Sequence, residues 1–179
     1  MIQRTHARPI RDAGLLASLY LVSFGLAGCD RNTAADLRAA LENRFFLGDT
    51  LFFESKLRCT AAVFRATEND VKPGVVTHTS HEAAQTAYRR EGTAVLRDPQ
   101  RSPHDLTDAL LMSGDGAFGK QALAAAALVD RCLTNEISVG FRIALTRPGA
   151  TLAYSDALGG VIILDPVDRK LYFAAGDPV

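Results

Sequence analysis

The uncharged run Ala13–Ala27 constrains the fold of this chain most, because it separates a basic head from everything that follows. The head carries Arg4, Arg8 and Arg11 against one acidic residue, Asp12. The run is shorter than the roughly 20 apolar residues that cross a bilayer core. It has the length of the apolar region of a secretory signal peptide, a segment that is removed and takes no part in the mature fold.

The residues that end this run indicate which kind of signal peptide it is. Leu26-Ala27-Gly28-Cys29 places an apolar residue and two small residues before a cysteine. Together with the head and the run, this sequence resembles the lipobox of bacterial lipoprotein precursors, over residues 1–30 only. The resemblance implies cleavage between Gly28 and Cys29 and a diacylglycerol on the Cys29 thiol. A further acyl chain is usual in that family, and two or more chains hold a protein stably at a membrane.

The residue after the expected lipid site bears on location. In some Gram-negative lipoproteins an acidic residue at the position of Asp30 keeps the protein at the inner membrane. The resemblance therefore favours the periplasmic face of the inner membrane over the outer membrane. We expect residues 1–28 to be a lipoprotein signal peptide and residues 29–179 to be a single globular domain, long enough to bury a core. The alternative is that the uncharged run is a short buried helix followed by an incidental cysteine.

Charge and cysteine content restrict the partners of the domain. The chain has 20 basic and 20 acidic residues, and loss of residues 1–28 leaves 17 against 19. A nearly neutral domain lacks the basic surface typical of nucleic-acid binding, so we expect no nucleic-acid partner. With Cys29 lipidated, Cys59 and Cys132 remain as a pair in an oxidising compartment, and we expect a disulfide between them. Two separate buried thiols are the alternative.

Hydrophobic spacing predicts an early strand and five helices. The alternation from Leu57 to Phe64 predicts a strand with Leu57, Cys59, Ala61 and Val63 on its core face, and residues 75–79 are expected to pair back on it as a hairpin. The apolar run 122–129 predicts a central helix that is buried all round. The helices are expected at residues 34–45, 80–90, 103–112, 117–133 and 135–146.

The end of the chain alternates short apolar segments with turn residues, which predicts a three-stranded meander. Its strands are expected at Thr151–Ser155, Val161–Leu164 and Leu171–Ala174, and a brief strand is expected at Thr93–Arg97. The early hairpin, the central helices and the late meander together predict an α+β domain. We expect an antiparallel sheet that is covered on one face by helices.

Three local patterns invite a functional interpretation. Residues 114–119 spell G-x-G-x-x-G, but the expected helix before them, rather than a strand, favours a helix–loop–helix connection over a dinucleotide site. His78 and His81 could share a metal ion, but Ser80 as a helix cap places His78 outside the helix, which favours a surface role. Residues 165–168, Asp-Pro-Val-Asp, could hold calcium, but a tight hairpin turn also explains them.

The remaining patterns favour structure over chemistry. Cys59 and Cys132 are far apart in sequence, unlike exchange-active C-x-x-C pairs, so the expected disulfide is structural. The aromatic cluster Phe45, Phe46, Phe52 and Phe53 could line a patch facing a partner, although most such clusters are core. We predict no catalytic, cofactor-binding or metal residue. The leading hypothesis is a lipid-anchored envelope domain that binds or scaffolds another envelope component; the alternative is an envelope hydrolase with catalytic residues scattered in sequence.

Overall fold

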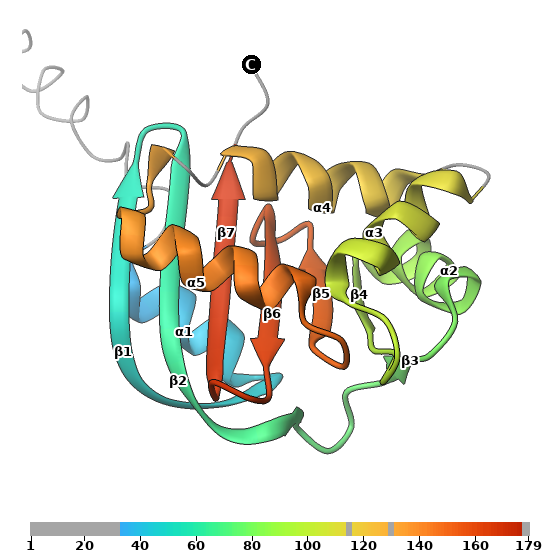
Figure 1. The fold of residues 1–179 in the computed structure, drawn as a ribbon, viewed down its shortest axis with the longest axis horizontal. Helices are drawn as coiled ribbons and strands as arrows, with labels where there is room; N and C mark the ends of the chain where they lie inside the picture. The colour runs from blue at the N-terminus through green and yellow to red at the C-terminus, as the bar shows by residue number, and fades with distance from the viewer. Residues whose placement is uncertain (1–32, 114–115, 129–130, 177–179) are drawn as a thin grey trace, which may run out of the picture.

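The computed structural model describes residues 33–113, 116–128 and 131–176. The predicted signal peptide and the lipobox lie outside these residues. Figure 1 shows one sheet with helices packed against it. The predicted α+β fold class is confirmed. The strands are β1 (Phe45–Lys56), β2 (Cys59–Val71), β3 (Thr77–His78), β4 (Thr93–Leu96), β5 (Thr151–Ser155), β6 (Gly160–Asp165) and β7 (Lys170–Gly176).

The seven strands form one sheet in the order β1-β2-β7-β6-β5-β4-β3. Every neighbouring pair is antiparallel except β3 and β4. The β1–β2 hairpin and the β5–β6–β7 meander meet where β2 pairs with β7, from Cys59 opposite Gly176 to Arg65 opposite Lys170. The late meander is therefore confirmed.

Four of the five helices begin after a serine or threonine whose side chain accepts a hydrogen bond from the first turn. They are α1 (Ala34–Glu42), α2 (His81–Glu91), α3 (Pro103–Met112), α4 (Ala117–Leu128) and α5 (Asn135–Thr146). Ser80 caps α2, and Gly92 ends it in the left-handed conformation that glycine adopts without strain. Ser102 and Asp105 form a reciprocal capping box at the start of α3.

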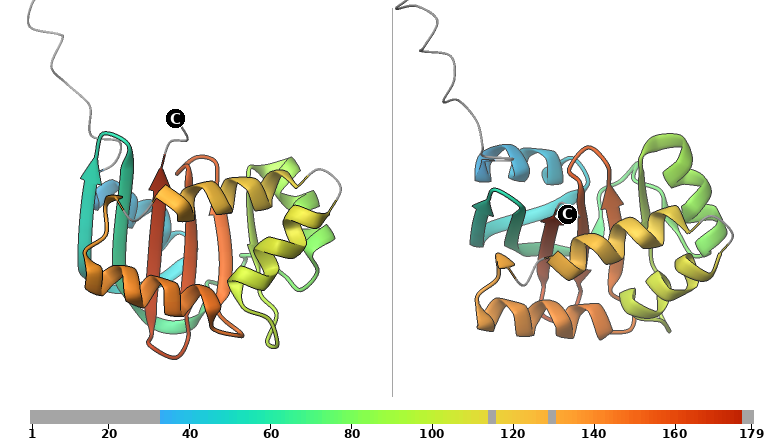
Figure 2. Two further views of the ribbon diagram at one scale, coloured as in Figure 1. Left: turned by 45° about the horizontal axis from the view of Figure 1, so that its top comes forward. Right: turned by 90° about the horizontal axis from the view of Figure 1, so that it is seen from above.

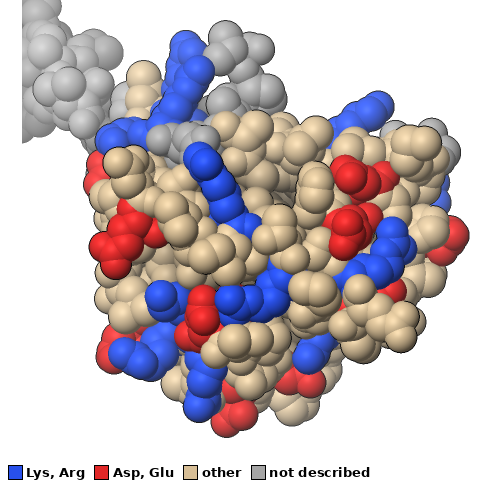
Figure 3. All heavy atoms as spheres, viewed as in Figure 1, with Lys and Arg blue, Asp and Glu red and all other residues tan. Residues whose placement is uncertain are grey.

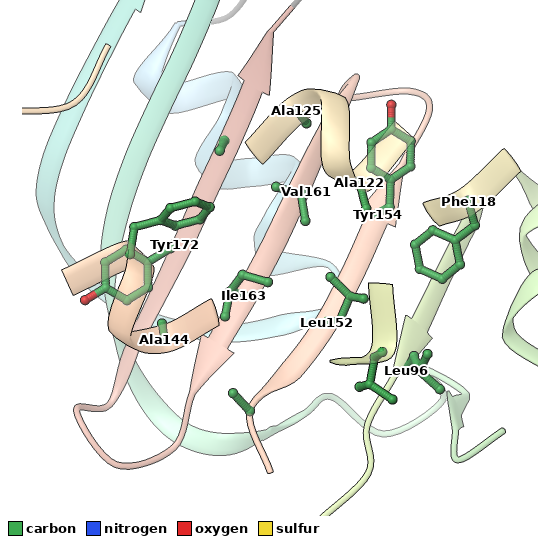
Figure 4. Close-up of a cluster of buried hydrophobic side chains, with 14 of the residues drawn as sticks. Leu96, Phe118, Ala122, Ala125, Ala144, Leu152, Tyr154, Val161, Ile163 and Tyr172 are labelled. Atoms are coloured by element: carbon green, nitrogen blue, oxygen red, sulfur yellow. The ribbon is translucent and has the colours of Figure 1, made fainter. Parts of the chain in front are cut away.

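Both faces of the sheet are buried. Alternate residues of β2 point to opposite sides, so Ala61 and Val63 join one apolar cluster, whereas Ala62 and Phe64 join the other. Figure 4 shows the first cluster, in which Phe118 of α4 lies beside Tyr154 of β5. Helices α2 to α5 contribute to this cluster, and α1 covers the opposite face, as both views of Figure 2 show.

Two predicted elements are wrong in detail. The first helix ends at Glu42, so Phe45 begins β1 and is almost fully buried in the cluster beneath α1. Residues 75–79 do not pair back on β2. Both edges of β2 are already occupied by β1 and β7, so Thr77 and His78 pair in parallel with β4 instead.

Two predicted burials are also wrong. Leu57 belongs to the β1–β2 turn rather than to a strand, and 66% of its surface is exposed. Helix α4 is not buried all round: Phe118, Ala122 and Ala125 face the sheet, whereas Leu123 is 48% exposed. The helix packs on the sheet and on α3, so its outer side, which carries Lys120, Gln121 and Leu123, remains at the surface.

The expected disulfide is present. It joins Cys59, at the start of β2, to Cys132, in the connection between α4 and α5, with Cα atoms 6.0 Å apart. Both residues are buried in the cluster under the helices. The bridge therefore ties the helical layer to the strand that joins the two halves of the sheet.

Reducing this disulfide should lower the melting temperature of the domain. A closed loop of this length stabilises by about 2–4 kcal/mol, and a domain of this size shifts by about 2–4 °C per kcal/mol. We therefore expect a drop of about 4–16 °C, measured by circular dichroism with and without reductant. The double variant Cys59→Ser/Cys132→Ser is the control, and a reductant effect of equal size in that variant would contradict the prediction.

Candidate functional site

A cleft of about 790 Å³ opens at the β3 end of the sheet. Its walls come from α2, β3, β4, the connection that follows β2, and Arg44, which lies between α1 and β1. Figure 1 shows α2, β3 and β4 together at this end of the molecule. The volume falls within the range of small-molecule binding sites.

Helix α2 presents one side to the cleft and another to the core. Ala83, Thr86, Ala87 and Arg90 line the cleft at the spacing of one helical face. Ala84, Gln85 and Tyr88 are buried on the other side. Tyr88 Oη donates a 2.7 Å hydrogen bond to Asp156, and its ring stacks on Phe118 with centroids 5.4 Å apart. These contacts fix the wall of the cleft against the sheet.

Arg44 is held in the cleft by one hydrogen bond of its side chain and one of its backbone carbonyl. Its Nη1 donates to Thr93 Oγ1 of β4, and Thr93 Oγ1 donates onward to the carbonyl of Tyr154 at 2.9 Å. The carbonyl of Arg44 accepts a 2.8 Å hydrogen bond from the backbone of Lys72, just after β2. The guanidinium is therefore positioned before any ligand arrives, and among the described residues Thr93 engages one of its five donors.

The other ionisable groups of the cleft carry both signs. Arg90 and Glu91 lie at the end of α2, and Arg90 forms no ion pair with the described part of the chain. Glu82 lies in the first turn, and its carboxylate is 2.8 Å from His81 Nε2. Hydrogen bonds from its own backbone amide and from Ser80, together with the charge of His81, lower the pKa of Glu82.

These groups suit binding of a ligand with an anionic end and an apolar part. A guanidinium binds a carboxylate or phosphate through two parallel hydrogen bonds. Glu82 is already engaged by Ser80 and His81, so Arg44 is the charged group of the cleft best placed for a new partner. Apolar lining comes from α2, β4 and the connection after β2: Val75, Val76, Ala83, Ala87, Ala94 and Val95.

The glycine-rich segment connects α3 to α4, and its described residues, 116–119, do not line the cleft. Gly114 and Asp115 lie outside the described residues. Gly116 has a φ of 56° and turns the chain into α4. A Cβ on Gly119 would lie 2.8 Å from the backbone nitrogen of Leu111, so this glycine allows close packing of α3 on α4.

The two histidines of the sequence pattern stand on either side of Ser80, which caps α2. His78 lines the cleft from β3, whereas His81 pairs with Glu82 in the first turn of α2. Within the described ranges, which omit residues 1–32, 114–115, 129–130 and 177–179, no group of three histidine, cysteine or acidic side chains is placed to hold a metal ion.

The turn at residues 165–168 is occupied by an arginine. Arg147 Nη1 lies 3.0 Å from Asp165 Oδ1 and 3.3 Å from Asp168 Oδ1. Asp165 Oδ1 also accepts hydrogen bonds from the backbone amides of Val167 and Asp168. Burial lowers the pKa of Arg147, but the hydrogen bonds and charges of the two aspartates outweigh it and raise that pKa overall. The guanidinium therefore fills the place that a calcium ion would need.

The charges of this ion pair also act on the pKa of Tyr172, which lies on β7. Burial, reinforced by the negative charges of Asp165 and Asp168, raises the pKa of Tyr172 to about 12. Its ring packs edge-on against Phe141 with centroids 6.0 Å apart, and a Cβ on Gly140 would come within 2.8 Å of its hydroxyl. Figure 4 shows the Tyr172 side chain beside α5.

The raised pKa predicts a loss of stability in alkali. The folded state holds the Tyr172 proton more tightly than the unfolded chain, whose tyrosine pKa is about 10. Its contribution is complete below about pH 10 and is lost as the pH rises toward 12, by about 2–3 kcal/mol in total. Urea unfolding at about pH 8 and about pH 11.5 should show a smaller alkaline loss for Tyr172→Phe than for the wild type.

The matched control is Tyr154→Phe. Burial and the charge of Asp156 also raise the pKa of Tyr154, but this residue lies on another strand, β5. That variant should keep the part of the alkaline loss that belongs to Tyr172. An alkaline loss in Tyr172→Phe equal to that of the wild type would contradict the assignment.

The predicted phenylalanine cluster is divided between different parts of the fold. Phe45 lies in the core beneath α1, Phe52 packs on the opposite cluster, and Phe53 packs on the α1 side. Phe46 lies under the ammonium of Lys72, 5.5 Å from its ring centroid. Alternation along β1 sends neighbouring phenylalanines to opposite faces, so they form no common patch.

Sequence reasoning missed Arg44, Thr86, Arg90 and Thr93, which the fold gathers in the cleft. Only the helical spacing of Ala83, Thr86, Ala87 and Arg90 gave a local signal, since it marks one face of α2. Arg44 reaches Thr93 over 49 residues of sequence, and no short-range pattern indicates that contact.

No helix within residues 33–113, 116–128 and 131–176 has the length and apolar character needed to cross a membrane. The Cys59–Cys132 disulfide is typical of proteins in an oxidising compartment outside the cytoplasm. Comparisons with protein-family models, with curated proteins and with solved structures find no match to this chain.

Proposed function

We propose that this protein is a lipid-anchored domain of the bacterial envelope that binds an anionic envelope component in the cleft beside α2. The observation that carries the proposal is Arg44, which is held by Thr93 and Lys72 next to apolar lining in a cleft of about 790 Å³. A preorganised guanidinium binds with less loss of side-chain entropy than a mobile one.

The anchor follows from the lipobox sequence and from the compartment that the disulfide indicates. Leu26-Ala27-Gly28-Cys29 supplies the cleavage site and the thiol, and Asp30 favours the periplasmic face of the inner membrane. The Cys59–Cys132 bridge supports export, because such bridges persist in oxidising compartments.

Replacing the proposed lipid site tests the anchor. In the native host, Cys29→Ala should abolish incorporation of labelled palmitate and leave the chain uncut or released, because no other thiol stands at a lipobox. Cys59→Ser/Cys132→Ser is the control and should keep the label. Unchanged labelling of Cys29→Ala would end the lipoprotein hypothesis.

Photo-crosslinking tests the cleft. A photoreactive phenylalanine analogue at position 86, on the cleft side of α2, should form an adduct with the ligand in intact envelopes. The same analogue at position 139, on the exposed side of α5, should not. Arg44→Ala should lower the adduct yield about tenfold, since a hydrogen bond to a charged group contributes about 1.5–3 kcal/mol.

A second variant separates binding from folding. Arg90→Ala removes the other cleft arginine but none of the contacts that hold Arg44, so it should lower the adduct yield at an unchanged melting temperature. Equal adduct yields at positions 86 and 139, or a yield that neither variant lowers, would contradict the cleft as the binding site. Turnover of a captured ester or amide, instead of a stable adduct, would favour the alternative of an envelope hydrolase.

A further inference from the structure

The β1–β2 turn carries an exposed apolar side chain between two cations. Lys56, Leu57 and Arg58 are all exposed, and Leu57 has 66% of its surface open to solvent. Leu57 is one of several exposed apolar side chains in the described part of the chain, and it lies directly between Lys56 and Arg58. Lys56 pairs with Glu54 at 3.3 Å, whereas Arg58 forms no ion pair with any described residue.

The disulfide brings a third cation to this turn. Cys59 and Cys132 follow Arg58 and Arg131 directly in sequence, and their Cα atoms are 6.0 Å apart. Lys56 Nζ donates a 3.3 Å hydrogen bond to the carbonyl of Arg131, which fixes the two segments side by side. Figure 3 shows several basic side chains projecting at the end of the domain where this turn lies in Figure 1. We call Lys56, Leu57, Arg58 and Arg131 the basic tip.

The expected lipid site is close to this end of the domain. Thr33 caps α1, and it lies only four positions after Cys29. Even a fully extended segment of that length spans about 14 Å at most. Figures 1 and 2 show that α1 runs along the sheet beside β1 and β2, with its N-terminal end nearer to the β1–β2 turn than its C-terminal end. A lipid on Cys29 therefore holds this part of the domain near the bilayer surface.

We propose that the basic tip docks on the anionic lipid surface next to the anchor, with Leu57 inserted among the headgroups. The inference rests on the proposed lipid anchor and adds the orientation of the domain. The short tether, the exposed leucine and the three adjacent cations all fit the same binding partner, which is a bilayer that contains anionic phospholipid. Basic residues next to a membrane are attracted by its negative surface potential, and an apolar side chain adds burial.

The absence of tryptophan from the sequence permits a specific test. Leu57→Trp, in the full lipidated protein reconstituted in vesicles of phosphatidylethanolamine and phosphatidylglycerol, introduces a single indole at the tip. Its emission should shift to shorter wavelength and be quenched by brominated lipid. The shift and the quenching should weaken in vesicles of phosphatidylcholine alone and at high salt, because both remove the electrostatic attraction.

Val167→Trp is the matched control for position. Val167 is also an exposed apolar residue in a hairpin turn, at 68% exposure, but it lies between β6 and β7 at the other end of the sheet. An indole at position 167 should show neither the shift nor the quenching.

Charge reversal tests the cations separately from the leucine. Arg58→Glu/Arg131→Glu, combined with Leu57→Trp, should abolish the shift. Arg65→Glu/Lys170→Glu makes the same change in charge at the other end of the β2–β7 pairing and should preserve it. An equal loss in both charge variants would overturn the assignment to the tip.

The mass of the N-terminal peptide separates the two possible failures. A lipidated Cys29 with an indole at position 57 that stays in water would overturn the docking proposal and leave the anchor standing. An unlipidated Cys29 would overturn the anchor and the docking proposal with it. Quenching that is the same with and without anionic lipid would overturn the role of the cations.

Discussion

The pairing of β2 with β7 is the contact on which the rest of the structure depends. It joins residues separated by more than a hundred positions, from Cys59 opposite Gly176 to Arg65 opposite Lys170. Without it, the β1–β2 hairpin and the C-terminal meander would be two small sheets, each with an exposed edge. With it, β2 becomes an interior strand, and its two faces supply both apolar clusters.

The sequence predicts well those parts of the fold that depend on residues close together in the chain. Ser80 and Gly92 bound α2, and Ser102 with Asp105 bounds α3, because capping depends on residues a few positions apart. The meander strands follow from local alternation and turns in the same way. The alternating pattern wrongly predicted a buried Leu57, because the hairpin turn falls at the start of the alternating stretch. Phe45 was wrongly predicted to be helical, because it continues the apolar spacing of α1 by coincidence.

The candidate site shows the limit of local rules more clearly. His78, Arg90 and Thr93 come from three separate elements and Arg44 from a connection, and only the complete sheet order places them around one cleft. The strand β3 beside this cleft has only two residues, too few to give a periodic signal. The disulfide was predictable from the number of cysteines and not from geometry, because only two cysteines remain when Cys29 is assigned to the lipid.

The sheet also separates the two proposed surfaces. The basic tip lies at the β1–β2 turn and the cleft beside β3 and β4, with β7, β6 and β5 between β2 and β4. Strand β1 begins next to the cleft, where Arg44 precedes it, and ends at the tip. A domain that rests on lipid by this tip therefore keeps its cleft away from the contact with the bilayer.

The Cys59–Cys132 bridge has a further consequence for how the chain would survive a protease. It closes a covalent ring that contains β2, β3, α2, β4, α3 and α4, and so every part of the cleft except Arg44. A single backbone cut inside that ring leaves the N-terminal and C-terminal pieces joined through sulfur. The meander then stays paired to β2, and a nicked molecule is retained wherever its N-terminal piece is held.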